Sequence, residues 1–177
     1  MPQTTLFSHE IGQVTFQPNI GLDASIRQSV VDMLNLLLAD EAVLLLKIHH
    51  PDKHANGMGF SELQTLYDAQ YKQVNAISNE IKERIQILGG VYLKNSEALI
   101  NSSRLDGKNN PIPGIVNILA DQEAFIRFLR EDAQKCSEIY EDQGTFALLV
   151  SVMCTHEKMA WMLRSSIEPE LSQDEER

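Results

Sequence analysis

The chain has 177 residues, of which 43% are apolar, and it carries a formal net charge of -10. This length suits a single domain with its own core, and the acidic balance disfavours partners held through phosphate contacts and favours the attraction of cations. No apolar run reaches membrane-spanning length and no signal-peptide pattern opens the chain, so we expect a cytoplasmic protein without a membrane segment.

The first predicted helix begins after Asp23, a good N-cap, and ends near Pro51. Proline disfavours helical geometry in the residue before it, so His50 is the expected boundary. The apolar residues of this segment recur at helical spacing, namely Ile26, Val30, Leu34, Leu37, Leu38, Leu44, Leu45 and Ile48.

The second predicted helix opens with a capping box, Ser61 and Gln64, and ends at Gly89 and Gly90. Its apolar arc comprises Leu63, Leu66, Tyr67, Tyr71, Val74, Ile77, Ile81, Ile85 and Leu88. A polar stripe borders this arc and consists of Gln64, Asp68, Asn75, Asn79 and Glu83. Such a stripe is either a solvated flank or the place where a second subunit or a metal ion is met.

A short helix is predicted at "NSEALINSS" (95–103), followed by the loop "DGKNNPIPG". A third long helix is expected over about 115–142 and a fourth over about 145–167, with Gly144 forming the tight turn between them. Two long helices, a crossover with a short helix and two more long helices predict an all-α, ferritin-like four-helix bundle. We expect an N-terminal tail (1–22), the bundle (23–167) and an acidic C-terminal tail (168–177).

Several segments resemble the Dps family of small ferritins. They are "LLADE" in the first helix, "FSELQTLYDAQY" and "NEIKERI" in the second, "NILADQEAFIRFLRED" in the third and "THEKMAWMLRSSIE" in the fourth, so that the resemblance spans about residues 34–167. It implies a homo-oligomeric hollow shell, expected to be a dodecamer, that binds, oxidises and stores iron and limits oxidative damage. It also implies a ferroxidase site built across the two-fold interface between subunits.

The family pattern can be aligned with this chain without a gap, and it places five residues at the ferroxidase site. The family's first histidine becomes Asp52 and its second becomes Gln64, while the family's aspartate is retained as Asp68. From the partner subunit, the family's aspartate becomes Asn79 and its glutamate is retained as Glu83. Both imidazoles are therefore lost, and one carboxylate has become an amide.

The altered set is rich in oxygen donors, and we expect it to bind iron (Fe2+ or Fe3+) more weakly than the mixed imidazole and carboxylate set of the family. Zinc is a second metal that these residues can ligate. Three nearby histidines, His49, His50 and His54, are candidate substitutes for the lost imidazoles if Pro51 re-routes the chain. The other interpretation is a loop with histidines and no fixed metal.

The resemblance also implies acidic residues at the pore through which iron enters, before the last helix. Glu141 and Asp142 occupy this region, whereas a position that is often acidic inside the helix is Ala147, so a weaker negative field is expected. His156 is interpreted as a packed, hydrogen-bonded side chain rather than a ligand. The two cysteines have no metal-binding spacing, and we assign them no chemistry.

Three functions follow from the sequence. The first is a Dps-like protein that oxidises and stores iron with an atypical site. The second, as an alternative, is a non-enzymatic Dps-like shell that has lost the ferroxidase chemistry. The third is direct DNA binding, which we do not expect through the tails because no Lys or Arg precedes Arg27 and half of residues 168–177 are acidic.

Overall fold

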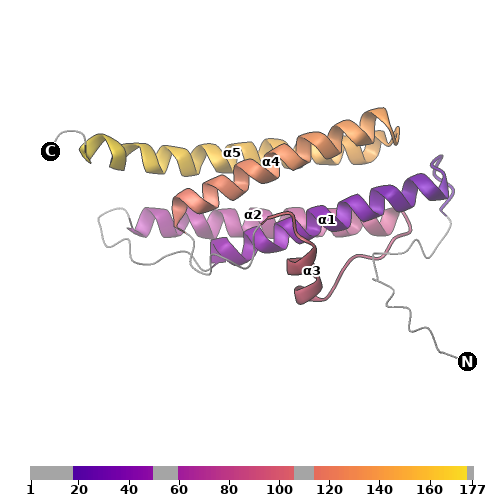
Figure 1. The fold of residues 1–177 in the computed structure, drawn as a ribbon, viewed down its shortest axis with the longest axis horizontal. Helices are drawn as coiled ribbons and strands as arrows, with labels where there is room; N and C mark the ends of the chain where they lie inside the picture. Colours follow the sequence, from indigo (N-terminus) through magenta and orange to yellow (C-terminus); the bar gives the residue numbers. More distant parts are fainter. Residues whose placement is uncertain (1–17, 50–59, 106–113, 175–177) are drawn as a thin grey trace, which may run out of the picture.

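A computed structural model describes residues 18–49, 60–105 and 114–174, with the side chains of residues 60 and 168–174 excepted. Within these ranges the chain is all-α, as predicted. Its elements are α1 (Ala24–His49), α2 (Phe60–Ile87), α3 (Ser96–Ser102), α4 (Ile115–Glu138) and α5 (Gln143–Asp174). The helices α1 and α2 form one layer and α4 and α5 a second, while the short helix α3 lies outside, against α1 (Figure 1). The predicted four-helix bundle with a short helix in its crossover is therefore confirmed.

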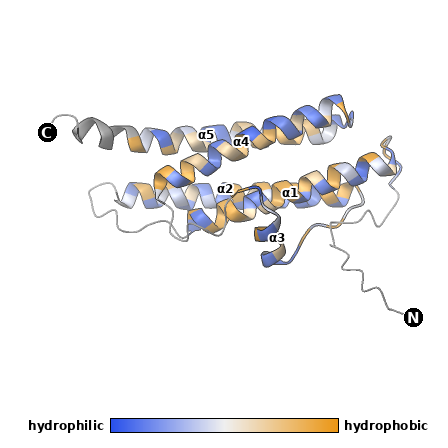
Figure 2. Cartoon of the chain, viewed as in Figure 1, coloured by the Kyte–Doolittle hydropathy of each residue, from blue (hydrophilic) through white to orange (hydrophobic). Residues whose placement is uncertain are grey.

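The core lies between the two layers, because each long helix turns an apolar face inward. Leu34 of α1, Ile81 of α2, Phe125 of α4 and Leu149 of α5 are all fully buried. Apolar residues are interspersed with polar ones along each of these helices, as the helical period of about 3.6 residues requires (Figure 2). None of the helices in the described ranges is long and apolar enough to cross a membrane.

The turn between α4 and α5 differs from the prediction. The third helix was expected to reach Asp142, but α4 ends at Glu138 and α5 begins at Gln143. Asp142 caps α5 instead, since its Oδ1 accepts a hydrogen bond of 3.0 Å from the backbone nitrogen of Thr145. The chain reverses at Glu141, whose φ of 51° is left-handed. Gly144 is therefore not the turn residue.

Gly144 lies in the first turn of α5, close to the guanidinium of Arg84. A Cβ placed there would lie 2.8 Å from the guanidinium nitrogen Nη2 of Arg84 on α2. The predicted end of α2 is confirmed. Gly89 takes a φ of 81°, and the backbone nitrogen of Gly90 bonds to the carbonyl oxygen of Ile85 at 2.9 Å, closing the helix.

Two helix ends differ in smaller ways. The helix α2 starts at Phe60, so Ser61 lies inside its first turn rather than before it as the predicted cap. The fourth helix was expected to end near Ile167, yet α5 continues through Pro169 to Asp174. A proline removes one backbone donor and disfavours a helix interior, but the flanking Glu and Leu residues are good helix formers.

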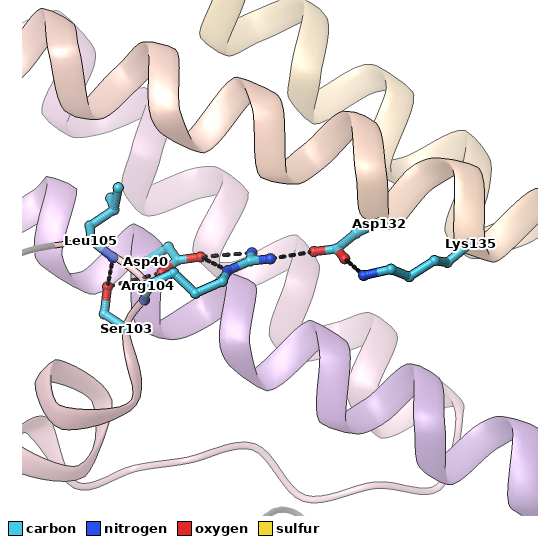
Figure 3. Close-up of polar contacts among 6 residues, drawn as sticks. All are labelled: Asp40, Ser103, Arg104, Leu105, Asp132 and Lys135. Atoms are coloured by element: carbon cyan, nitrogen blue, oxygen red, sulfur yellow. Dashed lines mark hydrogen bonds and ion pairs between the residues drawn. The ribbon is translucent and has the colours of Figure 1, made fainter.

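Arg104 follows α3 in the crossover and connects this segment with α1 and α4 (Figure 3). Its guanidinium pairs with buried Asp40 of α1 at 2.8 Å and with buried Asp132 of α4 at 2.9 Å, and lies over the ring of Phe128. Asp40 also accepts a hydrogen bond of 2.9 Å from the hydroxyl of Ser103. The crossover is thereby held between α1 and α4 directly after α3.

Candidate metal centre

Four of the five residues predicted for the ferroxidase site lie along α2, on the polar stripe. Asp68, Asn79 and Glu83 are exposed, and Gln64 is partly buried. The amide nitrogen of Gln64 donates to Asp68 Oδ1 at 3.0 Å, so these two are neighbours on one turn. Asn79 Oδ1 accepts from Lys82 Nζ at 3.3 Å. The stripe thus presents carboxylate and amide oxygens to the outside of the subunit.

The two retained carboxylates cannot bind the same ion within one subunit. Asp68 and Glu83 are separated by 15 residues of continuous helix, which corresponds to about 22 Å along the axis. Donor atoms on one metal ion lie within about 4.5 Å of each other. Among the described residues, moreover, no three His, Cys, Asp or Glu side chains gather to hold a metal ion. A site that uses both carboxylates therefore needs a second subunit.

One of the candidate substitute histidines lies beside this stripe. His49, the last residue of α1, places its ring centroid 5.2 Å from that of Tyr71 on α2, with the two rings tilted by 38°. Tyr71 follows Asp68 by three residues, so it lies less than one helical turn along the same helix. Asp52, His50 and His54 lie outside the described residues.

The two residues predicted for the pore occupy different environments. Glu141 is exposed, whereas Asp142 is buried and pairs with Arg84 Nη2 at 2.7 Å. Burial alone would raise the pKa of Asp142, but hydrogen bonds from Thr145 and the charge of Arg84 outweigh it and hold that pKa below its usual value. The charge of Asp142 is therefore compensated within the subunit, and that of Glu141 faces solvent.

A cluster of three buried polar side chains, Glu41, Gln122 and His156, was not predicted from the sequence. His156 of α5 is fully buried, and its Nδ1 and Nε2 contact Gln122 Oε1 of α4 at 2.6 Å and Glu41 Oε1 of α1 at 3.0 Å. The interpretation of His156 as a packed, hydrogen-bonded side chain is confirmed. The sequence held a signal for one of these partners, Glu41, because "LLADE" places two acids within an apolar run.

The two cysteines are in unlike surroundings. Cys136 is buried on α4, and Cys154 is exposed on α5. Burial, reinforced by the charges of Asp142 and Asp132, raises the pKa of Cys136 to about 12. Cys136 therefore remains a protonated thiol at neutral pH.

Comparison with known proteins agrees with this architecture. The family model for the ferritin-like domain matches residues 31–169. An uncharacterized low temperature-induced protein of Nostoc sp. is 34% identical over 154 residues, which are 85% of this chain and 86% of the relative. DNA protection during starvation protein 2 of Bacillus anthracis is 27% identical over 141 residues, covering 78% of this chain and 96% of the relative.

A solved structure supports the same fold. DpsC from Streptomyces coelicolor superposes with a TM-score of 0.78 at 26% sequence identity, and the alignment covers 88% of this chain and 92% of that one.

Proposed function

The chain belongs to the ferritin-like family and, within it, to the Dps proteins, and from this premise we propose that it takes up, oxidises and stores iron inside a hollow homo-oligomeric shell. Iron is the substrate and cargo of this activity. Removing free iron(II) would limit the oxidative damage that it promotes, so protection of DNA would not require a DNA-binding arm.

The position of the polar stripe is the observation that carries this proposal. Gln64 and Glu83 are equally distant from the point between Gln73 and Val74, and so are Asp68 and Asn79. Two copies of α2 that cross antiparallel about a two-fold axis at this point would place Gln64 opposite the partner's Glu83. The same axis would place Asp68 opposite the partner's Asn79, so a single symmetric interface would create two identical sites.

The donor atoms suit an iron site of reduced strength. Asp68 and the partner's Glu83 supply two carboxylates, and the amides of Gln64 and the partner's Asn79 add carbonyl oxygens without charge. We propose Asp52 as a further oxygen ligand. The contact of His49 with Tyr71, close to Asp68, supports His49 as a substitute imidazole. A dodecamer is the shell that we expect, as in the family.

Iron would reach the interior through an acidic opening. We propose that Glu141 supplies the attracting charge there, because it is exposed on the turn before α5. Asp142 contributes less field at this opening, since the guanidinium of Arg84 compensates its charge at 2.7 Å.

Iron(II) oxidation by the purified shell tests the proposal. Ferric absorbance is followed after iron(II) is mixed with oxygen or with peroxide, for the wild type, Asp68→Ala and Glu83→Ala. Each variant removes one of the two charged ligands that α2 supplies, so we expect the initial rate to fall by about 10 to 100-fold or more. Glu80→Ala is the matched control, because Glu80 is an exposed carboxylate of α2 outside the polar stripe, and its rate should equal that of the wild type.

Equal rates in all four proteins would remove the enzymatic part of the proposal. The chain would then be a shell that retains the fold without the chemistry. Iron-soaked crystals distinguish the remaining cases, since anomalous scattering beside Asp68 and the partner's Glu83 indicates binding without turnover. Absence of such a peak in wild-type crystals would contradict the site itself.

A further inference from the structure

The polar cluster around His156 lies away from the proposed iron site and within the core. Glu41 of α1, Gln122 of α4 and His156 of α5 are each fully buried. They form a chain in which Gln122 contacts one ring nitrogen at 2.6 Å and Glu41 contacts the other at 3.0 Å. The ring of Phe125 closes one side, edge-on at 4.7 Å between ring centroids. Three helices of the bundle therefore meet at one imidazole that has no access to water.

The hydrogen bonds of this chain determine its number of protons. Gln122 Oε1 can only accept, so Nδ1 of His156 carries a hydrogen and donates it. If Nε2 also carries a hydrogen, the ring is a cation that faces ionised Glu41. If Nε2 is bare, Glu41 must be a carboxylic acid in order to donate to it. Either way, one proton lies between Glu41 Oε1 and His156 Nε2, and the pair has no net charge.

Any other proton count would be costly in this environment. Without the shared proton, two lone pairs would face each other across 3.0 Å beside an uncompensated carboxylate. With a second proton, two hydrogens would face each other and the core would hold a net positive charge. The other atoms of the cluster offer no compensation, because Glu41 Oε2 and Gln122 Nε2 have no hydrogen-bond partner in the described part of the chain.

The acid next to Glu41 acts in the same direction as burial, because both raise the pKa of Glu41. Asp40, the residue before Glu41, is the other acid whose charge acts on it, and Asp40 is itself paired with Arg104. On the α2 side, Gln70 is uncharged and donates to the carbonyl oxygen of Met159, about one turn along α5 from His156. Burial raises the pKa of Glu41, and the facing His156 offsets this only in part. The folded chain thus retains a proton that a solvated carboxyl would release.

We propose that Glu41 and His156 hold one shared proton in the sealed core, and that Gln122 sets the position of this proton. Separation of α5 from α1 and α4 at alkaline pH releases the proton. In an unfolded chain at pH 8 a free glutamate is ionised and a free imidazole is neutral. Unfolding then releases one proton per subunit, and the unfolding equilibrium constant rises by up to about tenfold for each pH unit. The contact of α1, α4 and α5 through Glu41, Gln122 and His156 is therefore less stable at alkaline pH.

Calorimetric unfolding at pH 8 in two buffers of different ionisation enthalpy counts the protons released. The test variant is Glu41→Gln, whose amide can donate to bare Nε2 and keep the hydrogen bond without a proton that titrates. We expect the wild type to release about one proton more per subunit than Glu41→Gln. Glu157→Gln is the control, because Glu157 is partly exposed and pairs with Arg130 at the surface, and it should match the wild type. Equal proton release by the wild type and Glu41→Gln would overturn the proposal.

Neutron diffraction from wild-type crystals grown in heavy water keeps the proposal testable if Glu41→Gln does not assemble. One deuterium between Glu41 Oε1 and His156 Nε2, together with one on Nδ1, supports the shared proton. A bare Nδ1, or no deuterium between the two side chains, overturns it.

Discussion

Buried acidic residues in this bundle are each paired with a cation or an imidazole. Asp142 pairs with Arg84 at 2.7 Å, Asp40 with Arg104 at 2.8 Å and Glu41 with His156 at 3.0 Å. A buried charge without a partner is strongly destabilising, so each of these acids depends on its partner more than a surface acid does. The contribution of such a pair is best revealed by removing one member.

Asp142→Asn should destabilise the folded chain by about 2 kcal/mol at pH 7, because Arg84 loses its carboxylate partner and Thr145 loses a charged acceptor. The pKa of Asp142 is lowered on folding, so its stabilisation is present above the ordinary value of 3.8. That stabilisation is lost as the pH falls through the lower pKa of the folded state. Thermal unfolding of the wild type and Asp142→Asn should therefore differ most near neutrality and converge in acid.

The neighbouring Glu141→Gln is the control for this change. Glu141 is exposed, so its neutralisation should leave thermal stability within about 0.5 kcal/mol of the wild type. The same variant should slow iron uptake at low salt and not at high salt, if Glu141 supplies the field at the opening. A gap between the wild type and Asp142→Asn that persists unchanged below pH 3 would contradict the assigned role of the carboxylate.

At the scale of elements, the crossover from α2 to α4 is held against the bundle by Arg104, directly after α3. Within the described part of the chain, Arg104 is the cation that pairs with fully buried Asp40, and it shares Asp132 with Lys135 (Figure 3). The guanidinium is suited to this position because its planar fork can address two carboxylates at once. Loss of Arg104 leaves two buried acids with at most one surface ammonium between them.

Arg104→Met should therefore lower the free energy of unfolding by about 3 to 5 kcal/mol, because it removes the charge and keeps the aliphatic part of the side chain. This corresponds to a fall in the unfolding midpoint of roughly 10 °C for a chain of this size. Lys135→Met is the matched control. Lys135 also pairs with Asp132, at 2.9 Å, but is half exposed, so its loss should change stability by less than about 1 kcal/mol. Similar midpoints for the two variants would show that Arg104 does not secure the crossover.

The elements could be predicted from the sequence where a local signal determines them. Apolar periodicity predicted the long helices, and the Gly89-Gly90 pair predicted the end of α2. The turn before α5 could not be predicted in this way. Its position depends on Glu141 adopting a left-handed φ and on the approach of Arg84 to Gly144, and that approach joins residues 60 positions apart. Long-range contacts of this kind leave no trace in local periodicity.

The candidate site could be predicted in part, for a similar reason. The resemblance identified Gln64, Asp68, Asn79 and Glu83, and their common stripe on α2 follows from helical spacing. The partners of His156 were missed, because Glu41 and Gln122 come from other helices and become neighbours of His156 only in the folded bundle.

At the scale of the whole molecule, the proposed site belongs to a pair of subunits. Asp68 of one subunit and the partner's Glu83 would serve one site, and the reverse combination would serve the other. A subunit carrying Asp68→Ala can therefore complement a subunit carrying Glu83→Ala. In such a mixed pair one site loses both carboxylates, and the other retains both.

This symmetry predicts a rate that a site within one subunit cannot produce. When the two variants are produced together in equal amounts and assemble at random, about half of the pairs are mixed, and each mixed pair has one intact site of two. We expect iron(II) oxidation at about a quarter of the wild-type rate, although each variant alone is nearly inactive. Shells assembled separately and then combined are the control, and they should remain inactive because their subunits are already paired. If the co-assembled shells are as inactive as this control, Asp68 and Glu83 do not meet across the two-fold axis.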